Sequence, residues 1–374
     1  MQNYDVIVVG AGLIGAACAD ALTRRGLRVL VLERGMAGGG TTAAGMGHLV
    51  VMDSPPAEFA LTAYSLEVWR EIVPHLPEDG EDDPCGTLWV AEDEDEMAHA
   101  KGQARSFATR AVRAELLDAR GLSQLEPSLR TGFVGGLFLP DDRVIYPPAV
   151  TRFFLQRAIR HGAQVRERVE VRSIESTRPG CMAVHTATGR IGTGQVVNAA
   201  GAFAPALTPG LPIEPRKGHL VITDRYPGLV RHQMVELGYV KSAHAGSGAS
   251  VAMNIQPRRT GQILIGSSRE YVGWDSSINR EVRGRMLARA AHYVPALREL
   301  SAIRTWIGFR PSTADKLPLI GEWEPGLTIA AGHEGLGITT ASGTAALIAD
   351  LLTGATPAID PVPYHPRREM PHDA

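Results

Sequence analysis

The sequence predicts an α/β fold, and three features near the N-terminus predict it. Residues 5–9 and 28–32 are short runs dominated by Val, Ile and Leu, which is typical of strands buried on both faces of a parallel sheet. An amphipathic run over residues 14–25 lies between them and predicts a helix that ends at Gly26. A strand, a helix and a second parallel strand form a βαβ unit.

The composition excludes several classes of protein. The chain has 374 residues, of which 44% are hydrophobic and 21% charged, so we expect a substantial core and two or three domains. The net charge of −2 predicts no nucleic-acid or anionic membrane partner. No apolar run reaches the roughly 18 residues that a transmembrane helix requires, and the first residues lack the basic start of a signal peptide. We expect a cytoplasmic protein.

The chain has three cysteines, which are Cys18, Cys85 and Cys181. They are too few and too widely spaced for a disulfide framework or a zinc ligand set, so we expect reduced thiols and no metal site.

A glycine motif links the first strand to the helix. Gly10 permits a tight turn, Gly12 lets a pyrophosphate approach the backbone, and Gly15 lets the helix pack closely on the sheet. Leu13 and Ile14 begin the helix, whose free N–H groups and positive dipole end would face the phosphates. The motif lies between two strands and opens a helix, which is the context that predicts a dinucleotide site.

Two further segments extend the predicted cofactor site. Glu33 ends the second strand, where its carboxylate can accept hydrogen bonds from ribose hydroxyls, and Arg34 follows it. Residues 38–48 are predicted to form a long loop of small residues, which favours a large flat cofactor such as FAD over NAD; the alternative is a flexible linker. The residues of this loop that we expect at the cofactor are Thr41, Thr42, Gly45 and Met46.

These segments and two near the C-terminus resemble the D-amino-acid oxidase superfamily of FAD amine oxidoreductases, which includes glycine oxidase and sarcosine oxidase. The C-terminal segments are residues 306–321 (WIGFRPSTADKLPLIG) and 331–339 (AGHEGLGIT), and a helix ending near Gly354 follows them. The resemblance implies oxidation of an amine by hydride transfer to the flavin. Because no cysteine lies near the second segment, the FAD is expected to be non-covalent.

Three more segments are similar to those of D-hydroxyproline dehydrogenases and of the small flavin subunits of opine oxidase and hydrogen cyanide synthase. They are residues 44–53 (AGMGHLVVMD), 85–91 (CGTLWVA) and 216–225 (RKGHLVITDR). This similarity implies a larger flavoprotein and an iron–sulfur protein as possible partner subunits. The chain itself has too few cysteines to hold a [2Fe–2S] cluster.

The resemblance also implies a discontinuous fold. An FAD-binding Rossmann-like domain of the GR2 type would comprise residues 1–84, 146–215 and 311–366. An inserted α+β substrate domain, built on a mostly antiparallel sheet, would comprise residues 85–145 and 216–310. Residues 361–374 form a Pro- and charge-rich tail, which we expect to be poorly ordered, and residues 367–374 would lie outside both domains as a flexible end.

The resemblance places additional residues at the cofactor. Val171, Ala200 and Gly201 would lie near the adenosine half of FAD. The backbone amides of a glycine loop before a helix would stabilise negative charge on the flavin ring. The residues expected near the flavin are Gly308, Gly335, Leu336, Gly337, Ile338 and Thr339.

Three residues are candidates for the substrate. Arg310 matches the family arginine that grips an α-carboxylate through two parallel hydrogen bonds; the alternative is a surface ion pair. His48 would line the substrate pocket or serve a structural role. Asn254 takes the place of a carboxylate-binding tyrosine of glycine oxidases, and its shorter side chain leaves room for a ring. No protein general base is assigned.

The sequence leaves three functions open. The first is oxidation of a cyclic secondary D-amino acid, foremost cis-4-hydroxy-D-proline or D-proline, with an electron acceptor other than oxygen. The second is a glycine, sarcosine or D-amino-acid oxidase that releases hydrogen peroxide. The third is a flavin subunit of a multi-subunit amine dehydrogenase. Glycine oxidase carries a second arginine close to the position that Gly335 takes in this sequence. The absence of that arginine here argues against glycine as the substrate.

Overall fold

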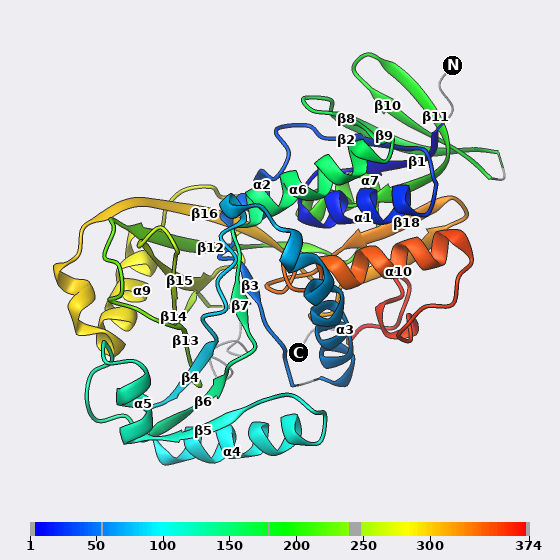
Figure 1. Ribbon diagram of the computed structural model, residues 1–374. Coiled ribbons are helices and arrows are strands. Elements are labelled where there is room, and N and C mark those ends of the chain that lie inside the picture. The colour runs from blue at the N-terminus through cyan, green and yellow to red at the C-terminus, as the bar shows by residue number, and fades with distance from the viewer. Residues whose placement is uncertain (1–3, 54, 179, 239–247, 372–374) are drawn as a thin grey trace.

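The computed structural model describes residues 4–53, 55–178, 180–238 and 248–371. Two large sheets lie side by side, the first at the upper right of Figure 1 and the second at the lower left. This is the predicted α/β architecture with a second, mostly antiparallel sheet.

The first sheet contains the predicted βαβ unit. Among the described residues it has eight strands, in the order β17-β18-β11-β1-β2-β8, with β10 and β9 extending from β11. The strands from β18 to β8 run parallel, whereas β17 and the β9–β10 hairpin are antiparallel to their neighbours. The strands are β1 (Tyr4–Val9), β2 (Val29–Leu32), β8 (Gln164–Arg166), β9 (Val171–Arg178), β10 (Cys181–Thr186), β11 (Gly189–Asn198), β17 (Leu319–Glu324) and β18 (Leu327–Ala331).

Both faces of the first sheet are buried, which explains its continuous apolar runs. Val6 and Val8 of β1 pack in one core cluster with residues of α1, α6 and α10. Ile7 and Val9 point to the opposite face and pack with residues of β9 and β10. Figure 1 shows these helices on one face of the sheet and the hairpin on the other.

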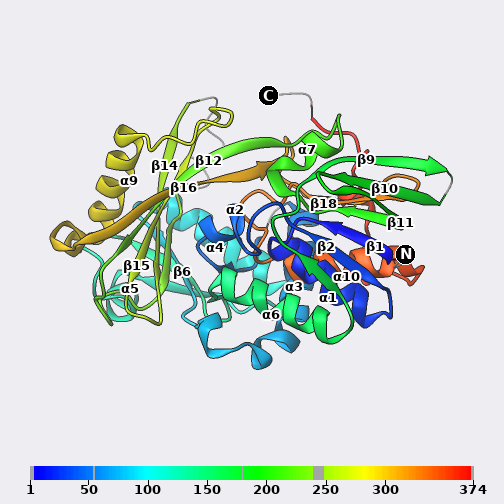
Figure 2. The same cartoon turned by 90° about the horizontal axis from the view of Figure 1, so that it is seen from above.

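The second sheet also has eight strands in the described part of the chain, in the order β16-β12-β15-β14-β13-β4-β6-β5. Only the β13–β4 pair is parallel within that part. Figure 2 shows the long strands β12 and β16 running from this sheet toward the first one. The strands are β4 (Thr87–Ala91), β5 (Glu115–Asp118), β6 (Gly135–Leu139), β12 (Glu214–Thr223), β13 (Gln233–Glu236), β14 (Ser250–Pro257), β15 (Ile263–Arg269) and β16 (Ala302–Ser312).

Short elements connect and cover the two sheets. β3 (His48–Leu49) and β7 (Arg143–Val144) form a small separate ladder. The 3-10 helices are Val73–His75, Glu78–Gly80, Gly201–Phe203, Pro295–Glu299 and Val362–Tyr364. The α-helices are α1 (Leu13–Arg24), α2 (Gly40–Ala44), α3 (Pro56–Ile72), α4 (Glu94–Ala108), α5 (Ala119–Leu125), α6 (Pro147–Arg160), α7 (Ala204–Leu207), α9 (Arg280–Tyr293) and α10 (Ala341–Thr353).

Two expectations from the sequence are wrong. The predicted loop over residues 38–48 contains the helix α2, because a hydrogen bond from the first turn of α1 and the close approach of β16 hold it in place. The tail was expected to be poorly ordered, but Arg367 and Arg368 are anchored: Arg367 donates to the Trp323 carbonyl oxygen and Arg368 forms an ion pair with Asp315. Residues 372–374 of the predicted tail lie outside the described residues.

Candidate active site

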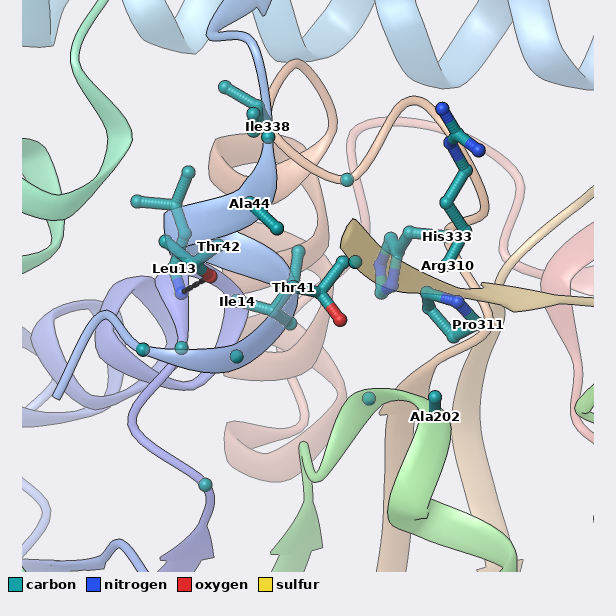
Figure 3. A pocket seen from close by; sticks show the side chains of 18 of the residues that line it. Leu13, Ile14, Thr41, Thr42, Ala44, Ala202, Arg310, Pro311, His333 and Ile338 are labelled. Atoms are coloured by element: carbon teal, nitrogen blue, oxygen red, sulfur yellow. Dashed lines mark hydrogen bonds between the residues drawn. The ribbon is translucent and has the colours of Figure 1, made fainter. Parts of the chain in front are cut away.

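A cavity of about 400 Å³ lies where the two sheets meet. The first sheet contributes the β1–α1 turn, the end of β2 and the segment after β11, and the second contributes residues of β12, β14, β15 and β16. Figure 3 shows Leu13 and Thr42 on one side and Arg310, Pro311 and His333 on the other. The cavity therefore brings the predicted cofactor and substrate residues together.

The β1–α1 turn is built from glycines that larger residues cannot replace. Gly10 has a φ of +103°, and a Cβ there would lie 2.6 Å from the carbonyl oxygen of Ala199. A Cβ on Gly15 would lie 2.0 Å from the Gly10 carbonyl oxygen, so Gly15 serves close packing and does not line the cavity. Gly12 caps α1 and does line it. The exposed backbone of this turn fits a pyrophosphate.

Backbone amides hold the Glu33 carboxylate at the end of β2. Its Oε2 accepts a hydrogen bond from the Ala11 amide at 2.8 Å, and its Oε1 accepts one from the Gly35 amide at 2.7 Å. The remaining lone pairs of this carboxylate can accept hydrogen bonds from ribose hydroxyls. Arg34 also lines the cavity, with its guanidinium 3.5 Å from the centre of the Phe203 ring.

The helix α2 brings two hydroxyls to the cavity wall. The Thr42 Oγ1 accepts a hydrogen bond from the Leu13 amide at 3.0 Å, drawn in Figure 3, and so joins α2 to the first turn of α1. The Thr41 Oγ1 donates to the Phe309 carbonyl oxygen at 2.6 Å and joins α2 to β16. The other predicted cofactor residues that line the cavity near these elements are Ile14, Gly45, Met46, Ala200 and Gly201.

The loop that precedes α10 forms another wall of the cavity. Gly335, Gly337 and Ile338 line it, and a Cβ on Gly335 would meet nothing within 4 Å. The helix begins a few residues later, so its free amides and positive dipole end lie behind this wall. The wall can therefore stabilise negative charge on a group bound in the cavity.

Besides Gly15, three of the predicted cofactor residues lie outside the cavity lining. Thr339 is fully buried; its Oγ1 donates to the His48 carbonyl oxygen at 2.9 Å and accepts from the Val50 amide at 3.1 Å. Leu336 borders a separate small cavity. Val171 packs in the core of the first sheet, on the face of the β9–β10 hairpin. These side chains support the walls from behind.

Arg310 lies near the end of β16, and its guanidinium reaches across β12. Its Nη1 donates to the Ser268 carbonyl oxygen on β15 at 3.0 Å. A Cβ on Gly218 of β12 would lie 2.4 Å from this Nη1, so the guanidinium can cross only at a glycine. Gly308 of β16 permits another close approach, that of α2, because a Cβ there would lie 2.4 Å from the Ala44 Cβ. Arg310 lines the cavity and can bind a carboxylate there.

A half-buried carboxylate, that of Glu334, shares this wall with Arg310. Its Oε1 forms an ion pair with the Arg216 Nη1 at 3.2 Å. Burial alone would raise the pKa of the carboxyl group, but the positive charges of Arg310, Arg269 and Arg216 lower it below its usual range. Glu334 is therefore an ionised hydrogen-bond acceptor and a weak base.

The two other predicted substrate residues also line the cavity. Burial lowers the pKa of His48 to about 4, so its imidazole is neutral near pH 7. Its Nε2 is buried and has no hydrogen-bond partner among the described residues. Asn254 on β14 is 7% exposed, and its Oδ1 likewise finds no partner within the part of the chain that the structure describes.

The sequence analysis missed Ser267, Phe203 and Gly218, which all line the cavity. The apolar run over residues 262–266 predicts a strand that ends before Ser267, whereas β15 continues to Arg269. Only the neighbouring strands place this serine in the wall, and no local pattern in the sequence signals it.

Residues 5–351 match the DAO family of FAD dependent oxidoreductases. The chain belongs to this family. It is 30% identical to a glycine oxidase of Pseudomonas aeruginosa, over 98% of this chain and 99% of that protein. It is 27% identical to the hydrogen cyanide synthase subunit HcnC of the same species, over 100% of this chain and 98% of that one. The crystal structure of an L-proline dehydrogenase from P. horikoshii superposes with a TM-score of 0.85 at 25% identity, covering 98% of this chain and 97% of that one.

The protein is thus an FAD-dependent amine oxidoreductase, and the cavity fits that cofactor. A backbone cradle at Gly12, a ribose acceptor at Glu33 and the wall at Gly335 and Gly337 meet the demands of a pyrophosphate, a ribose and a ring that gains negative charge. Cys18, Cys85 and Cys181 all lie outside the cavity lining, which supports non-covalent binding. Across the described ranges, no helix is long and apolar enough to cross a membrane.

Proposed function

We propose that this enzyme oxidises a cyclic secondary D-amino acid, foremost cis-4-hydroxy-D-proline or D-proline, to the imine. The observation that carries the proposal is the open wall around Arg310, where Asn254 and Gly335 leave space for a ring. The resemblance to glycine oxidases places a tyrosine and a second arginine near these two positions. The similarity to an L-proline dehydrogenase supports a cyclic substrate.

The chain's own residues bind and orient the substrate. Arg310 binds the α-carboxylate through two parallel hydrogen bonds and so sets the position of the adjacent carbon. The Gly12 turn, Glu33 and the loop at Gly335 and Gly337 would hold FAD, which would supply a hydride acceptor for that carbon. Neither His48, whose pKa is lowered to about 4, nor the ionised Glu334 is suited to store a proton near pH 7. The substrate amine is therefore bound in its neutral form, and no protein general base is assigned.

We also propose that the electrons leave to an acceptor other than oxygen. The similarity to a subunit of a cyanide-forming enzyme and to a dehydrogenase supports this choice. A larger flavoprotein with an iron–sulfur protein is the partner that we infer for the chain. The alternative is a glycine oxidase that uses oxygen, which the 30% identity to a glycine oxidase supports.

Anaerobic stopped-flow reduction of the flavin tests the substrate. We expect cis-4-hydroxy-D-proline and D-proline to bleach the flavin absorbance, and glycine, sarcosine and L-proline to do so at least tenfold more slowly. Arg310→Leu should weaken substrate binding by about 3 kcal/mol with little change in FAD content, because the carboxylate loses a charged partner. Arg304→Leu, on the exposed part of the same strand, is the matched control. Faster reduction by glycine would favour the oxidase alternative.

Reoxidation of the reduced enzyme tests the acceptor. Reduced enzyme is mixed with air-saturated buffer or with an artificial dye, and the return of the oxidised flavin spectrum is followed. We expect reoxidation by air to be much slower than steady-state turnover with the dye. If air restores the oxidised spectrum as fast as turnover, the enzyme is an oxidase.

A further inference from the structure

Buried polar atoms without partners occur in the cavity wall. The Asn254 Oδ1 and the Ser267 Oγ have no hydrogen-bond partner among the residues described, although Asn254 is 7% and Ser267 3% exposed. An unsatisfied buried polar group costs about 1–3 kcal/mol, so proteins keep such groups mainly where something else completes them. Both residues line the cavity, so a molecule bound there can supply the missing partner.

The two residues lie side by side on neighbouring strands. Asn254 of β14 pairs in register with Gly266 of β15, the residue before Ser267. The next residue along β15, Ser268, accepts the hydrogen bond from Arg310. Ser267 is therefore next to the residue that the carboxylate anchor contacts, and Asn254 lies on the neighbouring strand, about 4.8 Å farther. A five-membered ring spans a gap of this size.

A hydroxyl group matches the two atoms chemically. The amide Oδ1 of asparagine only accepts hydrogen bonds, whereas a serine hydroxyl both donates and accepts. A ligand hydroxyl can donate to the Asn254 Oδ1 and accept from the Ser267 Oγ at the same time, which satisfies both. A methylene group at that place satisfies neither and leaves both polar atoms buried without partners.

We infer that Asn254 and Ser267 form a hydroxyl-binding subsite, which makes the enzyme select a ring that carries a hydroxyl group across from its carboxylate. This inference rests on the proposed function and narrows it to hydroxylated cyclic amino acids over D-proline. Arg310 holds one end of the ring and the Asn254–Ser267 pair holds the other, so binding at both ends also fixes which face of the ring is presented.

Two carboxylates that cannot be oxidised test the subsite by binding alone. They are cis-3-hydroxycyclopentanecarboxylate and cyclopentanecarboxylate, which lack the amine and differ by one hydroxyl. Their dissociation constants are measured on the FAD-loaded enzyme from the change in the flavin spectrum. We expect the hydroxylated ligand to bind roughly 5- to 150-fold more tightly, the range that corresponds to one or more satisfied buried polar groups.

Variants of the pair should abolish this preference. In Ser267→Ala and in the nearly isosteric Asn254→Leu, the ratio of the two dissociation constants should fall to about 1–3, while the unsubstituted ligand binds as tightly as before. Ser267→Thr retains a hydroxyl and should keep most of the preference. Ser250→Ala, on the same strand as Asn254 but outside the cavity lining, is the control and should keep all of it. FAD content verifies that each variant is folded.

Steady-state kinetics with two substrates distinguishes a failure of the hydroxyl subsite from a failure of the proposed function. In the wild type, kcat/KM for cis-4-hydroxy-D-proline should exceed that for D-proline by a similar factor, and in the variants this ratio should fall toward 1. If the variants lower both equally, or if the wild type binds both carboxylates equally, the pair does not recognise a hydroxyl and the inference is wrong, although the proposed function stands. If neither amino acid reduces the flavin, the proposed function fails, and the ratio of dissociation constants still decides the subsite.

Discussion

At the scale of single residues, burial decides which side chains in the site carry charge. His333 is 4% exposed, its Nε2 lies 3.0 Å from the Thr344 Oγ1, and burial lowers its pKa to about 3. His48 is held neutral near pH 7 for the same reason. Arginine side chains, which cannot be deprotonated under these conditions, are left to provide the positive charge that a substrate carboxylate needs.

The lowered pKa of His333 predicts a loss of stability in acid. In the unfolded chain its pKa is near 6.5, whereas in the folded protein it is about 3. Below about pH 6.5 the unfolded chain binds a proton at this histidine that the folded protein does not bind. The contribution of His333 to the free energy of unfolding is therefore fully present above about pH 6.5 and is lost as the pH falls toward the folded pKa. By about pH 4.5 the loss should reach about 3 kcal/mol.

Urea unfolding of the FAD-loaded enzyme at about pH 7 and about pH 4.5 measures this effect. His333→Gln should lose less free energy of unfolding between the two conditions than the wild type does. His75→Gln, at an exposed position, should lose as much as the wild type. An identical loss in all three proteins would mean that His333 does not cause the dependence.

At the scale of elements, the strand–turn–helix at the N-terminus is determined by close backbone contacts. Gly10 has a positive φ, and a Cβ there would lie 2.6 Å from the Ala199 carbonyl oxygen, so the turn requires a glycine. The helix α2 supports the turn because the Thr42 Oγ1 accepts a hydrogen bond from the Leu13 amide. The β1–α1 turn and α2 thus form one unit, although α1 and β2 lie between them in the sequence.

Gly12→Val should abolish FAD binding. Its Cβ alone would lie 3.1 Å from the Thr42 Oγ1, and the two methyl groups would fill the cradle that a pyrophosphate needs. The ratio of flavin to protein absorbance after purification measures the loss. Gly102→Ala is the matched control, because a Cβ there meets nothing within 4 Å in the middle of α4. A yellow, fully loaded Gly12→Val protein would contradict the assigned cradle.

At the scale of the whole molecule, the C-terminal segment holds distant parts together. Tyr364 is 1% exposed, and its hydroxyl donates to the Ala57 carbonyl oxygen of α3 at 2.6 Å. Arg368 pairs with Asp315 and donates to the Pro318 carbonyl oxygen at 3.0 Å. The segment therefore joins α3 to the chain that follows Arg310, close to the cavity wall.

Tyr364→Ala should lower the free energy of unfolding by about 3–5 kcal/mol, the range for loss of a large buried aromatic side chain. Val362→Ala, two residues away and 69% exposed, should change it by less than about 0.5 kcal/mol. Chemical denaturation of both variants with FAD bound measures the difference. Equal stability of the two variants would restore the expectation of a loosely attached tail.

The resemblance to a known family supplied FAD as the cofactor and Arg310 as the candidate carboxylate anchor, whereas the sequence by itself determined the parallel sheet and the glycine turn. These follow from local patterns, because apolar runs indicate burial on both faces of a strand and glycines indicate backbone positions that no side chain can occupy. Only the tertiary structure decided that Thr339 supports the wall while Gly337 lines it, that Ser267 faces the cavity, and that the tail is anchored. Each of these depends on strands and helices that are remote in the chain, and short-range sequence patterns carry no record of such contacts.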